Sequence, residues 1–256
     1  MDSRKSCRKD VKMELSAYDN KHVRVTDKWG HVFEGLASSL GADYCFHEYG
    51  EEEEGILVGD YLVYKSDIKE IQRIRPHGTA ELGTTHLLLR RYRPEDAPWL
   101  YRYFGCNENM FRYSGWNPYA TEEMAEKTVQ EFIDQYEDPH FYGWIIDCDD
   151  CAAGTIGAYD YENDSIEVGF SIAEPYQGRG YAGEALAEVL KYLTENEEIP
   201  QVTAWCAADN LASKRTLEKA GMAFSGLEKG GITVGDRVYD KLNYEYRKEN
   251  GSLKRH

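Results

Sequence analysis

Apolar and polar residues alternate with the period of a β-strand along the N-terminal part of the chain. The alternating segments are 21–27, 31–39, 56–65 and 68–74. Residues 8–20 favour a short helix, and EYGEEEEG at 48–55 has the composition of a solvated loop. Together these patterns predict a small, strongly bent all-β module.

The C-terminal part mixes helical and strand periods. A strand is expected at 86–92, and helices are expected from Pro94 and after the N-cap candidate Thr121. The apolar stripe of the second helix consists of Met124, Thr128, Val129, Phe132, Ile133 and Tyr136. Three strands then follow in close succession at 141–147, 152–160 and 165–173. Their short connections predict an antiparallel meander.

The last quarter of the chain alternates between the two periods. We expect a helix at 181–193, a strand at 201–207, a helix at 211–220 and a strand pair at 235–247. Asp209 or Asn210 caps the second of these helices, and Gly221 ends it. Between the two parts lies an aperiodic stretch rich in glycine and proline. We therefore expect the chain to have four regions. These are a module at 1–75, a linker at 76–84, a second domain at 85–248 and a tail at 249–256.

A glycine-rich segment, YQGRGYAG at 176–183, joins the third strand of the meander to the helix that follows. The apolar face of this helix, formed by Ala182, Leu186, Val189, Leu190 and Leu193, predicts packing on the sheet. The glycines therefore lie at the helix N-terminus, where unpaired N–H groups and the helix dipole attract an anion. The sequence predicts a phosphate site there, although a plain tight turn has the same composition.

Composition narrows the classes of protein that fit. The 256 residues are 41% hydrophobic, which suits a packed soluble core, and we find neither an export signal nor a membrane span. Six scattered cysteines favour a reducing compartment, so we expect a cytoplasmic protein. The net charge of −16 argues against binding to the phosphate backbone, so nucleic acid is not expected as a partner. Most of this negative charge lies beyond residue 80. The C-x-x-C of Cys148 and Cys151 fits a hairpin turn better than a metal site, and no metal is expected.

The spacing of Gln177, Gly178, Arg179, Gly180, Tyr181 and Ala182 resembles the Gln/Arg-x-x-Gly-x-Gly/Ala signature of the GNAT superfamily of N-acetyltransferases. TTHLLLRRYRPEDA, VGFSIAEPYQGRGYAGEAL and DNLASKRTLEKAGM also resemble segments of its ribosomal-protein branch, in the family's order, across residues 84–248. The resemblance implies an α/β (α+β) fold with a mixed central sheet, flanked by helices. Here a small barrel-like module precedes that fold.

The same resemblance implies a cofactor, acetyl-CoA, and the residues that hold it. The backbone of 177–182 is expected to bind the pyrophosphate, and the backbone of Phe170, Ser171 and Ile172 the pantetheine arm. Asn210 and Ser213 supply polar contacts, unless they serve only as helix cap and turn residues. Arg179, Lys214 and Arg215 either add charge near the phosphates or remain solvated helix residues.

The implied reaction is direct attack of a primary amine on the thioester, with no cysteine nucleophile. Glu167 is our candidate general base, although it also fits a strand residue that faces solvent. A backbone N–H near Phe170 is expected to bind the oxyanion. Many relatives carry a tyrosine proton donor where this chain has Leu217, so Ser213 becomes the candidate partner of the leaving thiolate.

The acceptor site is expected between the first two helices of the second domain. Tyr113, Trp116 and Asn117 are the candidate substrate residues, together with Glu167, unless the aromatic side chains only close the core. The segment 235–247 resembles the family's last strand pair, which implies that Asp236, Arg237, Tyr239 and Asp240 shape acceptor choice. The acceptor is a protein N-terminal α-amine or a small polyamine-like or antibiotic amine, and a non-catalytic CoA-binding module is the alternative.

The N-terminal module resembles the Sm-like small barrels, with Gly30 and Gly35 at points of sharp curvature. The nucleotide-binding motifs of the RNA-binding Sm proteins are not evident in it, so RNA binding is not expected. Its acidic loop favours a basic protein partner, and its strand edges alternatively allow self-association.

Overall fold

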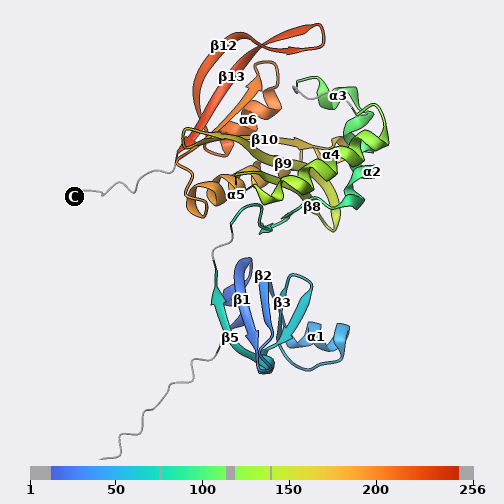
Figure 1. Cartoon of the computed structure of the whole chain (residues 1–256), viewed down its shortest axis with the longest axis vertical. Coiled ribbons are helices and arrows are strands. Elements are labelled where there is room, and N and C mark those ends of the chain that lie inside the picture. The colour runs from blue at the N-terminus through green and yellow to red at the C-terminus, as the bar shows by residue number, and fades with distance from the viewer. Residues whose placement is uncertain (1–12, 75–76, 114–118, 139, 248–256) are drawn as a thin grey trace, which may run out of the picture. The chain divides into compact units, whose positions relative to one another are not determined.

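The computed structural model describes residues 13–74, 77–113, 119–138 and 140–247. The chain divides into two compact units, Met1–Arg75 and Pro76–His256, and each is described by itself (Figure 1). None of the described helices has the length and apolar character that crossing a membrane requires. Trp116 and Asn117, two of the predicted substrate residues, lie outside the described residues, as do residues 8–12 of the helix expected at 8–20.

The N-terminal unit is built on one antiparallel sheet of order β4-β3-β2-β1-β5. Its strands are β1 Lys21–Asp27, β2 Val32–Leu40, β3 Gly55–Val58, β4 Tyr61–Tyr64 and β5 Ile68–Arg73. Gly30, at φ +96°, lies in the turn between β1 and β2. Val23, Val25 and Ile56 are fully buried in the core of this sheet. The sequence therefore located three of the strands separately and read the β3–β4 hairpin as the single segment 56–65. Closure of the sheet into a barrel stays a prediction.

Helix α1, Ala42–Tyr49, was missed in the sequence, where its last two residues were interpreted as loop. Cys45 is its one buried side chain, so the helix carries no apolar stripe that a period of 3.6 would reveal. Only its end has a signal in the sequence, which is Gly50. This glycine adopts the left-handed conformation of a C-terminal cap, at φ +80°. Further upstream, the described part of the expected first helix is a single 3₁₀ turn, Leu15–Tyr18.

The C-terminal unit contains an eight-stranded mixed sheet of order β12-β13-β11-β10-β9-β8-β7-β6. The strands are β6 Leu82–Gly83, β7 Leu88–Arg90, β8 Tyr142–Cys148, β9 Cys151–Glu162, β10 Ser165–Ile172, β11 Gln201–Ala207, β12 Ala223–Val234 and β13 Arg237–Arg247. β8, β9 and β10 form the predicted antiparallel meander, and β10 and β11 are parallel. The predicted fold class, a mixed sheet flanked by helices, is confirmed.

Helices cover both faces of this sheet (Figure 1). They are α2 Ala97–Leu100, α3 Glu108–Phe111, α4 Glu122–Asp134, α5 Tyr181–Glu195 and α6 Leu211–Lys219. Trp144 and Ile146 of β8 pack with α5, whereas Ile145 between them packs with α2 and α4. Successive strand residues point to opposite faces, so the two helical layers lie on opposite sides of β8.

The helical stripes predicted from the sequence agree with the structure in α5 and in part in α4. Leu186, Val189 and Leu193 of α5 are buried, as expected. In α4 the buried side chains are Ala125 and Val129, while Met124 is exposed and was wrongly included. Ala125 is too small to stand out in an apolar pattern, so the sequence placed the stripe one residue early.

Residues 77–84 are hydrogen-bonded into the C-terminal unit, although the sequence suggested a linker there. Thr79 is buried, donates its hydroxyl to the carbonyl of Phe141, and accepts a hydrogen bond from the N–H of Gly143. Ala80 accepts a bond of 2.7 Å from the indole of Trp144, which is itself fully buried. Truncation after this stretch would leave that indole N–H unsatisfied in the core.

We therefore expect a fragment of residues 76–256 to fold by itself, and one of residues 85–256 to be markedly less stable. Loss of the Thr79 and Ala80 bonds, with a buried indole left unpaired, should cost about 3 kcal/mol or more and lower Tm by about 10 °C. Thermal unfolding of both fragments, monitored by circular dichroism, measures the difference. Equal melting temperatures would mean that 76–84 is a dispensable linker.

Candidate active site

The parallel strands β10 and β11 separate after a short paired region. Pairing runs from Ser165 with Gln201 to Glu167 with Thr203 and then ends, although β10 continues to Ile172 and β11 to Ala207. Over the same stretch β10 remains paired with β9 on its other side. The edge of residues 168–172 that faces β11 therefore has no described strand partner. A gap of this kind offers backbone groups to an extended amide-containing ligand.

The glycine-rich segment ends at the N-terminus of α5, as the sequence predicted. Gly178 and Gly180 have φ of +77° and +88°, a region that side-chain-bearing residues rarely adopt. No atom lies within 4 Å of a Cβ built at either glycine. The first helical bonds are those from Gly183 and Glu184 to the carbonyl of Gly180, so the N–H groups of the preceding residues point out of the helix. The segment combines open space with free donors, which is what an anion requires.

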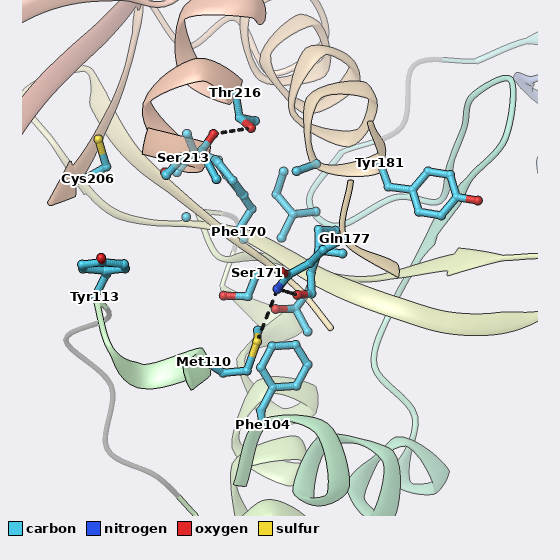
Figure 2. Close-up of a pocket in the computed structure, with 18 of the residues that line it drawn as sticks. Phe104, Met110, Tyr113, Phe170, Ser171, Gln177, Tyr181, Cys206, Ser213 and Thr216 are labelled. Atoms are coloured by element: carbon cyan, nitrogen blue, oxygen red, sulfur yellow. Dashed lines mark hydrogen bonds between the residues drawn. The ribbon is translucent and has the colours of Figure 1, made fainter. Parts of the chain in front are cut away.

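A cavity of about 850 Å³ joins this segment to the gap between the strands (Figure 2). One part of its wall is formed by residues 168–172 and by Gln177, Gly178 and Gly180–Gly183. Cys206, Asn210 and Ser213 line it from β11 and α6. The cavity thus brings together Phe170, Ser171, Ile172, Gln177, Gly178, Gly180, Tyr181, Ala182, Asn210 and Ser213 of the predicted cofactor residues.

Arg179 is the predicted cofactor residue whose side chain is not part of this wall. Its guanidinium lies over the ring of Tyr176 and donates to the carbonyl of Pro175 at 3.2 Å. Of the two basic residues of α6 that were expected near the phosphates, Arg215 lines the cavity, while Lys214 pairs with Glu218 at 4.0 Å. The donors at the helix start are therefore mainly backbone groups.

The side chain of Gln177 points away from the start of α5. Its amide donates to the carbonyl of Ile172 at 2.9 Å and contacts the sulfur of Met110 at 3.7 Å (Figure 2). Asn109, also in α3, donates to Glu174 at 3.1 Å. Segments that are distant in sequence are in this way held together at the cavity wall.

Ser213 lies in the first turn of α6, beside the thiol of Cys206. Its N–H donates to the side chain of Asn210 at 3.1 Å, so Asn210 is the N-cap of the helix, as predicted. Burial raises the pKa of Cys206 to about 11, and a hydrogen bond with the Ser213 side chain partly offsets this rise. The thiol is therefore neutral at neutral pH. The sequence analysis did not single out Cys206, which lies near the end of β11, shortly before the N-cap Asn210 of α6.

Leu217, at the position where many relatives have tyrosine, is buried in the core and also borders the cavity. A leucine has no proton to donate. Ser213 therefore remains the candidate hydroxyl on α6 for a role at the leaving group.

Glu167 is the last residue of β10 that pairs with β11, and it is half-buried. Its carboxylate accepts a hydrogen bond of 2.8 Å from the indole of Trp205, which lines the cavity, whereas Glu167 itself does not. Burial raises the pKa of Glu167, and the Trp205 bond and Lys241 oppose that effect. The carboxylate is thus one hydrogen bond away from a residue that lines the cavity.

The other end of the cavity is aromatic. Tyr113 meets Tyr239 of β13 edge to face, with ring centroids 5.4 Å apart. Tyr119, Phe141 and Tyr159 are further aromatic residues that line the cavity. Burial, followed by the charge of Glu167, raises the pKa of Tyr159 to about 12. Of the predicted substrate residues, Tyr113 lines the cavity. Glu167 does not, but it is hydrogen-bonded to the lining residue Trp205.

Tyr159 and Trp205 were missed as site residues in the sequence. Both are partly buried and lie at strand positions that alternate with the buried ones, so no local signal distinguishes them. Among the described residues, no cluster of three or more His, Cys, Asp or Glu side chains could hold a metal ion.

Comparison with known proteins agrees with this geometry. A family model described as an acetyltransferase (GNAT) domain matches residues 86–223. YnaD, an uncharacterized N-acetyltransferase of Bacillus subtilis, is 28% identical over 169 residues, which represent 66% of this chain and 97% of that protein.

Two solved structures resemble the C-terminal unit. RimL, a ribosomal-protein alpha-N-acetyltransferase in complex with coenzyme A, has a TM-score of 0.60 at 22% identity and covers 64% of this chain and 95% of its own. MccE, a microcin self-immunity acetyltransferase in complex with acetyl-CoA and AMP, has a TM-score of 0.59 at 17% identity and covers 64% and 93%. At these identities the two structures show the fold alone.

Proposed function

Because the chain belongs to the GNAT family of acetyltransferases, we propose that it transfers the acetyl group of acetyl-CoA to the N-terminal α-amine of a protein. Acetyl-CoA is the cosubstrate, and an amine is the acceptor. The single observation that supports catalysis by this chain is the continuous cavity, which runs from the glycine-rich segment to an aromatic end near a carboxylate.

The cofactor is proposed to lie along the β10–α5 wall of the cavity. Its pyrophosphate receives the N–H groups of 178–182, since the N–H of Gln177 already donates to the carbonyl of Glu174. Its pantetheine amides pair with the free edge of 168–172. The end of pairing at Glu167 supports this placement, since a closed sheet would leave no backbone groups for the ligand. All the described lining residues belong to the C-terminal unit.

In the proposed reaction, the neutral amine attacks the carbonyl carbon of the thioester. The backbone N–H of Phe170 stabilises the oxyanion, and Glu167 accepts the amine proton through a water molecule. The carbon–sulfur bond then breaks, and the CoA thiolate is protonated to the thiol. Ser213 hydrogen-bonds the departing sulfur. A hydroxyl is a weak acid, so its main effect is to stabilise the thiolate.

Replacing Ser213 by alanine should lower kcat about tenfold while leaving KM for acetyl-CoA nearly unchanged. One hydrogen bond to a developing charge is lost, whereas the Asn210 cap, which uses the Ser213 backbone, is retained. Steady-state kinetics measure both constants. Ser213→Thr is the matched control because it keeps a hydroxyl on the same turn, and it should retain most of kcat. Equal rates for the alanine variant and the parent would remove Ser213 from the mechanism.

The aromatic end of the cavity supports an amine acceptor, because tyrosine and tryptophan faces attract a cationic amine before it loses its proton. A protein α-amine is the first choice, since RimL acts on a ribosomal protein. The similarity to MccE favours a small-molecule amine as the second candidate.

Incubation with acetyl-CoA and a matched panel of peptides and small amines separates these candidates. Each peptide is paired with its N-terminally blocked form, and products are identified by mass spectrometry. A gain of one acetyl group on the free peptides alone supports the proposal. Acetylation of small amines alone would favour the second candidate, and absence of any product with CoA still bound would indicate a binding module.

A further inference from the structure

Cys148 and Cys151 face each other across the β8–β9 hairpin, next to the glycine-rich segment. They are paired residues of the two antiparallel strands and close a two-residue turn, in which Asp149 and Asp150 have φ of 50° and 59°. Both thiols are free. Directly opposed residues of antiparallel strands have Cα atoms about 4.5 to 5.5 Å apart, which is within the range that a disulfide spans.

The two thiols differ in exposure, which suggests a separate role for each in thiol exchange. Cys151 is exposed and accessible to an oxidant, whereas Cys148 is buried. An exposed cysteine can form a mixed disulfide, and a neighbouring buried cysteine can then displace the outer group. The turn supplies both partners within four residues.

The hairpin contacts both ends of the glycine-rich segment. The thiol of Cys148 donates to the hydroxyl of Tyr181, the first residue of α5, at 3.0 Å. Strand β9 of the hairpin also contacts the 3₁₀ turn Glu174–Tyr176, which leads into the glycines. Tyr176 and Tyr181 both line the cavity and flank residues 177–180.

We propose that Cys148 and Cys151 form a reversible disulfide that weakens acetyl-CoA binding. The oxidant is a low-molecular-weight disulfide. The Cys151 thiolate attacks it and releases one thiol, and the Cys148 sulfur then attacks Cys151, gives up its proton and releases the second thiol. The protein loses two electrons and two protons, and the oxidant is reduced to two thiols.

Oxidation acts on the cofactor site through Tyr181. In the disulfide, the Cys148 sulfur has no proton to donate, and it is drawn towards Cys151 on the outer side of the hairpin. Tyr181 then loses its donor at the start of α5. Loss of one hydrogen bond that fixes the helix start corresponds to about a fivefold loss in affinity.

The test oxidises the full-length chain with glutathione disulfide. Intact mass and peptide mapping should show loss of two hydrogens from the peptide that contains Cys148 and Cys151, and calorimetry should show acetyl-CoA binding about fivefold weaker. Reduction by a phosphine should restore both the mass and the affinity. In Cys151→Ser, which keeps the Cys148–Tyr181 contact, oxidant should leave the affinity unchanged.

Two results would overturn the proposal. One is the absence of the intramolecular bond, with both thiols unmodified or Cys151 held as a stable mixed disulfide. The other is a bond that forms without any change in affinity. The inference rests on the proposed cofactor placement, but bond formation is measured without cofactor, and binding by a Gly180 variant tests that placement separately.

Discussion

Replacing Gly180 by valine should weaken acetyl-CoA binding about 100-fold or more. Gly180 is the N-cap of α5 at φ +88°, and the space around its Cα is open. A valine would project into the proposed pyrophosphate position and would also pull the backbone out of the left-handed region. The N–H donors would then be both blocked and misdirected. Losing two hydrogen bonds to a charged group accounts for the expected effect.

Calorimetry with acetyl-CoA measures this loss, and Gly235→Val is the matched control. Gly235 lies in the turn between β12 and β13, has φ +58°, and likewise has no atom within 4 Å of an added Cβ. Both variants therefore carry comparable backbone strain, but only one lies on the glycine-rich segment. If Gly180→Val bound acetyl-CoA as tightly as Gly235→Val, the pyrophosphate would have to bind elsewhere.

Replacing Glu167 by glutamine should lower kcat about 100-fold, the low end of what a general base contributes. Glutamine is close in shape and keeps an oxygen that accepts the Trp205 bond, so the change removes basicity and charge but not packing. For the parent, kcat/KM should rise with pH as Glu167 loses its proton. Because burial raises the pKa of Glu167, that limb should lie above the range of an exposed glutamate. In the variant only the limb of the acceptor amine should remain.

Stability provides the control for this variant. A pKa that is higher in the folded chain means that the ionised carboxylate is disfavoured by folding, a cost present above the folded pKa and absent below the unfolded pKa. Glutamine removes this cost, so Tm at pH 7 should not fall. An inactive variant with an unchanged Tm would identify a chemical role. An unchanged rate and pH profile would leave Glu167 as a structural partner of Trp205.

Several elements were readable because their signals are local. The turn at 177–180 needs glycine for its positive φ, and Asn210 caps α6 by contacting a residue three positions ahead. The meander follows from period-two segments joined by short turns. Each of these features depends on neighbours within a few residues, so the sequence contains them directly.

Other features have no local signal. Helix α1 escaped detection because it buries a single side chain, and the role of residues 77–84 depends on bonds to Phe141, Gly143 and Trp144 about 60 residues away. A glycine-rich stretch without periodicity has the same appearance whether it is solvated or packed.

The sequence by itself determined most of the element order and the glycine-rich start of α5, because backbone conformation and hydrophobic period act over short distances. The cofactor residues follow from the family resemblance and stay a prediction. Only the tertiary structure decided that β10 and β11 separate after Glu167, that Trp205 stands between Glu167 and the cavity, and that Cys148 reaches Tyr181. These features arise where strands and helices far apart in the chain meet. Which side chain then reaches which neighbour depends on sheet twist and packing, and these are properties of the whole fold.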